Sequence, residues 1–208
     1  MNGPLPKTCE RALLEQFMKA ESMALWAVRA AQSQHVPSSV LQFLRRHEEE
    51  EAEHLHQFEA LLGATSHGKT IPPRVPSQWW ALAVHLFGYE SLGLEFAKLL
   101  VEVRPDLQSI LDDEEVHVGF FEQEVRRLLA QDVTIVGYTR NAARAWRRRL
   151  PRTVDRYLHD DDLAAFRDVL PSRILAAIDE RFAAAGLLGW PHRQLVPGQA
   201  SMLSESIG

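Results

Sequence analysis

Three observations predict an all-α protein. Ala, Leu, Glu and Arg, which favour helices, dominate the 208 residues. β-Branched residues are few, and no Asn-Gly or Asp-Gly turn lies between two apolar runs. Apolar residues instead recur at steps of three and four, the period of a helix with one buried face. The apolar share of 46% and the charged share of 25% fit a globular protein, and no apolar run is long enough to span a membrane.

Four long helices are expected in the first 130 residues. The first ends before the helix breaker Pro37, the second follows the capping residues Ser38 and Ser39, and Gly63 stops it. Pro105 occupies the first turn of the fourth helix, a position that tolerates proline. The expected ranges are about Lys7–Ser33, Ser39–Gly63, Ser77–Val103 and Pro105–Ala130.

The lengths of the connections predict how these helices are arranged. Short loops join the first helix to the second and the third to the fourth, so each pair should form an antiparallel hairpin. The 14 residues from Gly63 to Pro76 reach about 46 Å when extended, whereas the second helix is about 35 Å long. This crossover can pass the whole bundle and make the second and third helices parallel, as in a ferritin-like four-helix bundle.

Additional C-terminal helices are expected after residue 130. One spans Thr134–Arg149, and Pro151 and Pro171 should divide the following chain into two shorter helices. These two are expected at Leu163–Val169 and Ile174–Ala185. The predicted organisation is a bundle over 1–130, helices packed on or capping it over 131–190, and a flexible tail over 191–208.

Arginines cluster in the segment Arg140–Arg152. A cationic amphipathic helix there could contact a nucleic acid or an acidic membrane surface. Asp155 and Asp160–Asp162 follow closely, and the whole chain carries a formal charge of -5. We therefore favour the interpretation that the segment is an exposed helix offsetting nearby acidic residues.

The second expected helix carries a Glu-x-x-His pair on its apolar stripe. Glu51 lies between Leu44 and Phe58 on that stripe, and His54 follows one turn later. Glu53 and His56 fall on the opposite, solvent-facing side. Glu51 and His54 are therefore the members of this acidic run that we expect to be buried.

The other three helices each place a carboxylate on an apolar stripe. Glu114 and His117 repeat the Glu-x-x-His spacing on the fourth helix, while Glu21 and Glu90 lie on the first and third. Measured from the connecting turns, all four glutamates can lie at one depth. An unpaired buried carboxylate is unfavourable by several kcal/mol, so four together require a compensating charge. A pair of metal ions bound by Glu21, Glu51, His54, Glu90, Glu114 and His117 would supply it.

This order of ligands resembles the ferritin-like di-iron carboxylate superfamily over roughly residues 10–130. The run from Glu51 to Phe58 looks like the second-helix motif of demethoxyubiquinone hydroxylases. Glu90 and Glu95 before an acidic Glu-x-x-His helix are similar to the tRNA-modifying di-iron hydroxylases. The resemblance implies that Glu51 and Glu114 bridge two metals and are the catalytic carboxylates. It also implies that Glu21 and Glu90 are terminal ligands and that each histidine binds one metal.

Several neighbouring residues are expected outside the ligand set. We expect His47, His56 and His85 at the surface or rim of the site, and Glu95 on the solvent side of its helix with Lys98 and Glu102. Glu48, Glu95 and Glu122 are weaker candidates for extra ligands. Four phenylalanines on the inward stripes should line a dry cavity beside the metals: Phe17, Phe58, Phe87 and Phe121.

The expected function is a non-haem di-iron oxidase or hydroxylase that activates dioxygen to oxidise a small organic substrate. Carboxylate and imidazole ligands suit two iron ions, Fe2+ or Fe3+, with manganese as the other candidate. An electron donor is then required, and a homodimer is one expected assembly. Two alternatives stay open: a ferritin-like iron oxidation and storage protein, and a peroxide-consuming enzyme like rubrerythrin or manganese catalase. The single cysteine, Cys9, favours a reducing compartment, the cytoplasm.

Overall fold

The structure is a computed structural model that describes residues 5–65, 74–131 and 133–189. All regular secondary structure in these ranges is helical, which confirms the predicted all-α class. None of the described helices is long and apolar enough to cross a membrane. The α-helices are α1 (Glu10–Gln32), α2 (Ser38–Leu62), α3 (Trp79–Val103), α4 (Gln108–Leu129), α5 (Val133–Tyr157) and α6 (Leu170–Ala184). Short 3-10 segments are η1 (Lys7–Cys9), η2 (Pro105–Leu107) and η3 (Asp161–Phe166).

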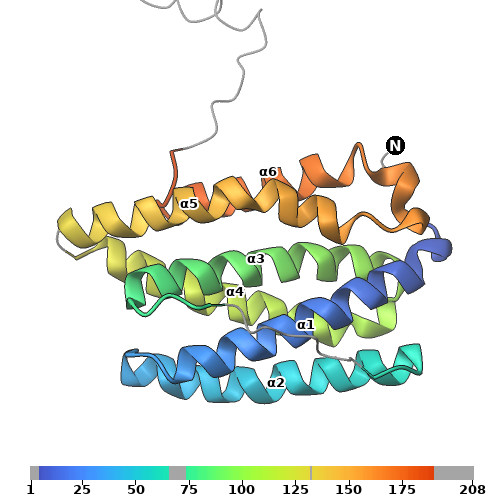
Figure 1. The fold of residues 1–208 in the computed structure, drawn as a ribbon, viewed down its shortest axis with the longest axis horizontal. Helices are drawn as coiled ribbons and strands as arrows, with labels where there is room; N and C mark the ends of the chain where they lie inside the picture. The colour runs from blue at the N-terminus through green and yellow to red at the C-terminus, as the bar shows by residue number, and fades with distance from the viewer. Residues whose placement is uncertain (1–4, 66–73, 132, 190–208) are drawn as a thin grey trace, which may run out of the picture.

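The helices form three layers of two (Figure 1). Helices α1 and α2 make one outer layer, α3 and α4 the middle, and α5 and α6 the other outer layer. Helices α2 and α3 run in the same direction in this view, as the length of the crossover predicted, although residues 66–73 of that crossover lie outside the described residues. Helix α3 packs against α1, α4, α5 and α6, so it is the centre of the molecule.

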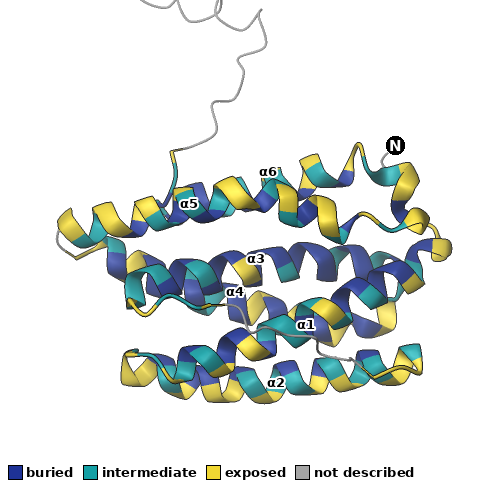
Figure 2. Cartoon of the chain, in the orientation of Figure 1, coloured by how far each residue is buried: buried dark blue, intermediate teal, exposed yellow. Residues whose placement is uncertain are grey.

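Helix α3 occupies the centre because it is apolar on most of its circumference. Buried residues make up 16 of its 25, whereas the outer helices keep one exposed face (Figure 2). A helix that is hydrophobic all round is stable only when other elements cover every side. The apolar core is one continuous cluster that reaches from Leu5 to Leu187, so α5 and α6 share the core of α1–α4.

The ends of the helices follow the local chemistry of the sequence. Gly63 adopts a left-handed conformation with a φ of 61° and closes α2, as glycine does after many helices. Pro105 opens η2, which leads directly into α4. The first helix begins later than the expected Lys7, because Lys7–Cys9 forms the 3-10 turn η1 before α1.

The prediction that Pro151 ends the fifth helix is wrong. Helix α5 continues through Pro151 to Tyr157. The buried face of α5 extends on both sides of the proline, with Trp146 and Leu150 before it and Val154 after it. Burial of these side chains against the core compensates for the hydrogen bond that a proline removes within a helix.

The chain after α5 also differs in detail from the expectation. The predicted helix at Leu163–Val169 is the 3-10 segment η3, and Pro171 lies in the first turn of α6 rather than before it. Proline fits this position because the first amides of a helix have no partner within the helix. Arg147 of α5 forms an ion pair with Asp179 of α6, which joins the two helices. The expected flexible tail, 191–208, lies outside the described residues.

Candidate metal centre

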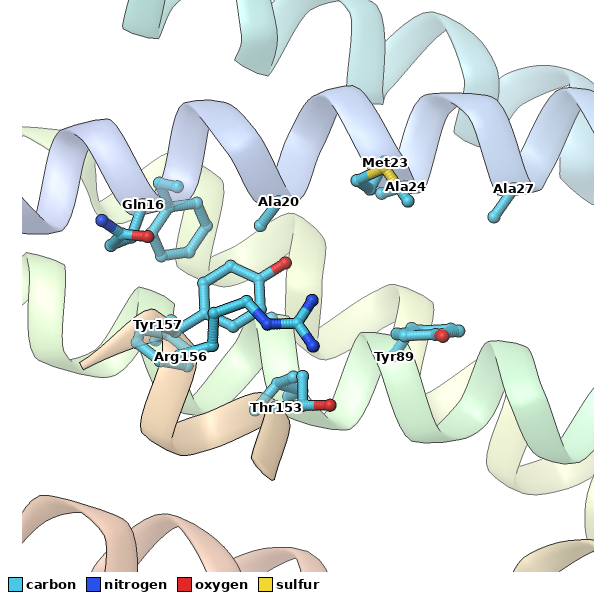
Figure 3. A pocket seen from close by; sticks show the side chains of 13 residues that line it. Gln16, Ala20, Met23, Ala24, Ala27, Tyr89, Thr153, Arg156 and Tyr157 are labelled. Carbon is cyan, nitrogen blue, oxygen red and sulfur yellow. The ribbon is translucent and has the colours of Figure 1, made fainter. Parts of the chain in front are cut away.

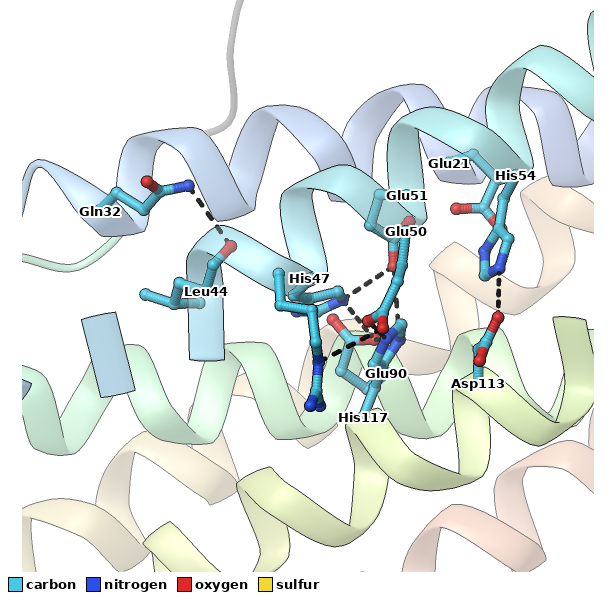
Figure 4. A network of polar contacts seen from close by, with 11 residues as sticks. Glu21, Gln32, Leu44, His47, Glu50, Glu51, His54, Glu90, Asp113 and His117 are labelled. Atoms are coloured by element: carbon cyan, nitrogen blue, oxygen red, sulfur yellow. Dashed lines mark hydrogen bonds and ion pairs between the residues drawn. The ribbon is translucent and has the colours of Figure 1, made fainter. Parts of the chain in front are cut away.

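The structure brings all six predicted ligands together in the interior. Glu21 comes from α1, Glu51 and His54 from α2, Glu90 from α3, and Glu114 and His117 from α4. Every one of these side chains is buried. Five of them are seen in Figure 4, where they point toward one another from facing helices.

The buried side chains form two groups that could each hold a metal ion. One group is Glu21, Glu51, His54 and Glu114, and the other is His47, Glu51, Glu90 and His117. Within each group, one potential ligand atom per residue lies within 4.8 Å of all the others. Ligand atoms at about 2.0–2.2 Å from one ion lie at most roughly 4.4 Å apart, so small side-chain movements suffice for coordination. Glu51 belongs to both groups and is placed to bridge two ions.

His47 is a candidate ligand that sequence reasoning missed. It was expected at the surface or rim, but its side chain is fully buried. Its Nε2 lies 2.8 Å from Oε1 of Glu51 and 3.5 Å from Oε2 of Glu90. The sequence did indicate that His47 faces inward. It lies four positions before Glu51 and seven before His54, and residues at these intervals share one face of a helix. His47 was not predicted because the neighbouring stripe through Leu44 and Glu48 looked like the inward face. Glu48 instead accepts hydrogen bonds from Arg29 and Gln32 at the surface.

His54 and His117 are each held by a carboxylate on the side away from the centre. Nε2 of His54 lies 3.0 Å from Oδ2 of Asp113, and Nε2 of His117 lies 2.9 Å from Oε2 of Glu50. An ionised carboxylate only accepts hydrogen bonds, so Nε2 is the protonated nitrogen in both rings. Each Nδ1 then carries a lone pair directed toward the glutamates. Carboxylate–histidine pairs of this kind orient the imidazole ligands of metals.

Six polar side-chain atoms at the centre have no hydrogen-bond partner within the described part of the chain. They are Oε1 of Glu21, Nδ1 of His47, Oε2 of Glu51, Nδ1 of His54, Oε2 of Glu114 and Nδ1 of His117. Leaving buried polar atoms unpaired is unfavourable by about 1–3 kcal/mol each, so such a concentration calls for a ligand. The formal charges agree, because two divalent cations carry the four positive charges that neutralise the glutamates of the two groups. These residues therefore fit a pair of metal ions.

The pKa values of three of the buried glutamates are strongly shifted. Burial, together with the charges of Glu51 and other glutamates, raises the pKa of Glu21 well above its usual 4.5. Burial and the charges of Glu51 and Glu90 likewise raise the pKa of Glu114. Burial alone would raise the pKa of Glu51, but hydrogen bonds from Glu21 and His47 lower it to about 2. Protons retained on Glu21 and Glu114 thus reduce the negative charge of the cluster.

The pKa values of His47 and His117 are shifted in opposite directions. Burial works against a charged His47, but the adjacent Glu90 and Glu51 raise its pKa well above 6.5. Burial and the nearby positive charge of His47 lower the pKa of His117 to about 4. The two rings lie 3.9 Å apart between centroids, so only one of them carries a proton charge readily. A neutral His117 is the form that binds a metal.

The burial of other residues near the site differs from the prediction for Glu95 and agrees with it for Glu53 and His56. Glu95 is buried, with 5% of its side chain exposed, rather than solvent-facing. It pairs with Lys98 of its own helix at 2.7 Å and with Arg181 of α6 at 3.0 Å, so its charge is already compensated. Glu53 and His56 are exposed, as predicted. His85 is half-buried, and burial and the charge of Arg149 lower its pKa.

The four inward phenylalanines are all buried, but they do not line one cavity as predicted. Phe17 and Phe58 pack with ring centroids 5.2 Å apart, and Phe87 stacks on Phe182 of α6. Only Phe17 of the four lines the cavity that lies between α1, α3 and α5. Phe58, Phe87 and Phe121 instead belong to the packed core, where the ring of Phe121 lies 5.9 Å from that of His47.

Comparison of the chain with protein-family models, with curated proteins and with solved structures gives no match.

Proposed function

We propose that the protein is a di-iron oxidase or hydroxylase of ferritin-like architecture that uses dioxygen to oxidise a small organic substrate. The observation that carries the proposal is the pair of four-residue groups that share Glu51. A shared carboxylate places two ions next to each other, and nitrogen and oxygen ligands without thiolate suit iron or manganese. The same pattern underlies the resemblance of Glu21, Glu51-x-x-His54, Glu90 and Glu114-x-x-His117 to di-iron carboxylate bundles.

Two iron ions bound here would supply the chemistry of dioxygen reduction and substrate oxidation. An external electron donor would be needed to keep them ferrous. The chain binds and orients. Glu51 would hold both ions, Glu21, His54 and Glu114 the first, and His47, Glu90 and His117 the second. Asp113 and Glu50 fix the imidazoles so that Nδ1 faces inward. The protons held by Glu21 and Glu114 are released when metal binds.

A largely apolar cavity next to the centre, open at one end, favours oxidation of an organic molecule over iron storage. It has a volume of about 250 Å³ and is lined largely by apolar side chains. Gly93 contributes to its wall, and a methyl group at Gly93 would stand only 2.8 Å from Oε2 of Glu114. A storage protein needs a route by which iron leaves the centre repeatedly, whereas an oxidase needs a dry space for its substrate.

Reaction of the reduced, iron-loaded chain with dioxygen tests this proposal. Anaerobic loading with Fe2+ should stop near two ions per chain, and admission of dioxygen should then consume it rapidly. We expect Glu51→Ala to lose both properties. Glu53→Ala is the matched control, because Glu53 lies on the exposed side of the same helix. His54→Ala and His56→Ala form a second such pair, one buried and one exposed.

Three results would contradict the proposal. Continued aerobic uptake of many iron ions per chain into a large assembly would indicate storage instead. Rapid destruction of hydrogen peroxide by a reduced protein that ignores dioxygen would indicate a peroxide-consuming enzyme. Equal dioxygen consumption by the Glu51→Ala and Glu53→Ala variants would place the reaction outside these residues.

A further inference from the structure

A cavity lies between α1, α3 and α5, on the side of the candidate metal centre away from α2 (Figure 3). Small residues of α1 open it: Ala20, Ala24 and Ala27 line one side, with Arg156 and Tyr157 of α5 and Tyr89 of α3 opposite them. Leu92 and Phe96 of α3 add apolar wall. Its volume of about 250 Å³ exceeds the roughly 150 Å³ of an apolar protein cavity that holds benzene, so it accommodates a ring with a short substituent.

The inner wall of the cavity adjoins the metal ligands at Gly93. A methyl group added to Gly93 would stand 2.8 Å from Oε2 of Glu114, an atom without a hydrogen-bond partner among the described residues. A molecule in the cavity therefore lies close to Glu114, a member of the first metal group.

The outer part of the cavity presents a positive charge. The guanidinium of Arg156 projects into the space between α1 and α5, near the hydroxyl of Thr153 (Figure 3). Among the described residues Arg156 forms no hydrogen bond or ion pair, unlike Arg147 on the same helix, which is paired with Asp179. Arg156 is exposed at this end of the cavity, and the planar guanidinium group suits a carboxylate because it donates two parallel hydrogen bonds.

An outer hollow of about 640 Å³ leads into the cavity and shares Gln16, Met23, Arg156 and Tyr157 with it. The hollow adds Lys19 and two acidic residues, Asp160 and Asp161. Asp161 pairs with Arg167 at 3.3 Å, and Asp160 accepts a hydrogen bond from the amide of Asp162. The hollow is therefore of mixed charge, and Arg156 is the charged residue that it shares with the cavity.

We propose that this cavity is the substrate site and that the substrate is a small apolar monocarboxylate. Its carboxylate binds Arg156 at the outer end, and its apolar body extends along α1 toward Gly93 and Glu114. That the bound molecule is a substrate rests on the proposed oxidase function, but its binding can be measured without any reaction.

Calorimetric titration of the full chain with 3-phenylpropanoate and with the neutral 3-phenylpropanol tests the site. We expect the acid to bind about tenfold more tightly than the alcohol, because only the acid forms a charge-assisted hydrogen bond with Arg156. Arg156→Gln should remove this preference. Arg152→Gln is the matched control: Arg152 is an exposed arginine of α5 outside the cavity lining, and its loss should leave the preference intact.

Ala24→Phe provides a second, steric test. A phenyl ring at Ala24 fills the space between α1 and α5, so both probes should bind at least tenfold more weakly while circular dichroism confirms the fold. Equal binding of acid and alcohol to the unaltered chain would overturn the proposal. Equal losses in Arg156→Gln and Arg152→Gln would also overturn it, whether or not Ala24→Phe folds.

Metal analysis of the same samples separates the two proposals. A chain that shows the predicted acid preference but binds no metal supports the cavity assignment and contradicts the oxidase function. A chain that binds two metals but neither probe contradicts the cavity assignment alone.

Discussion

Asp113→Asn should weaken one of the two metal sites selectively. Asp113 lies 3.0 Å from Nε2 of His54, and His54 belongs only to the group that contains Glu21 and Glu114. Asparagine keeps the size of the side chain but loses the charge that keeps Nε2 protonated and Nδ1 free for metal. The first ion should therefore bind less tightly, while the second group keeps all its residues.

The magnitude follows from the exposure of the carboxylate. Loss of a carboxylate behind a histidine ligand usually weakens metal binding by about 10- to 100-fold. The Asp113 side chain is 43% exposed, so water replaces part of its effect. We expect about tenfold weaker binding, equivalent to about 1.4 kcal/mol. Glu50, which holds His117 in the second group, is only 29% exposed. Glu50→Gln should therefore weaken binding of the second ion by more than about tenfold.

Competition with a chelator under anaerobic conditions measures both dissociation constants. Asp112→Asn is the control, because Asp112 is exposed on the same helix and accepts a hydrogen bond from Gln108, away from the histidines. The reasoning is refuted if Asp113→Asn and Asp112→Asn bind metal alike. It is also refuted if Asp113→Asn and Glu50→Gln weaken the same ion.

Three further predictions concern His47, pH and the docking of α5. His47→Ala should lower metal content from two ions to about one per chain, measured by elemental analysis, and retention of two would remove His47 from the ligand set. Because its pKa is raised above 6.5, folded His47 keeps a proton that the unfolded chain has lost; the metal-free protein should therefore lose up to about 1.4 kcal/mol of unfolding free energy per pH unit above 6.5. Glu21 and Glu114 act in the same direction, and urea unfolding that shows equal pH dependence with chelator and with metal would contradict this. Gly88→Ala should destabilise the fold by about 1–3 kcal/mol in the same assay, because the added methyl would meet the ring of Trp146 at 2.4 Å; unchanged stability would show that α5 does not pack so closely on α3.

Periodicity was sufficient to locate most of the candidate site. Glu21, Glu51, Glu90 and Glu114 lie on stripes whose apolar members are also buried, so their inward direction could be deduced within each helix. His47 was missed because two nearly parallel stripes run along α2, and the one through Leu44 and Glu48 looked more continuous. Only contact with Glu90 and His117 of other helices distinguishes them.

Features that depend on distant parts of the chain could not be predicted in this way. Glu95 is buried because Arg181, which lies 86 residues later, neutralises it. Pro151 stays within α5 because the core covers the helix on both sides of it. The cavity forms where α5 lies against the small residues of α1, and no pattern within either helix determines that packing.

The metal content of the purified chain tests the central claim most directly. Protein loaded anaerobically with Fe2+ and freed of excess ions should contain two ions per chain by elemental analysis. Glu51→Ala should contain almost none, because Glu51 belongs to both groups, while Glu53→Ala should again contain two. A metal content near zero in the unaltered chain, or the same content in Glu51→Ala and Glu53→Ala, would contradict a two-metal centre at these residues.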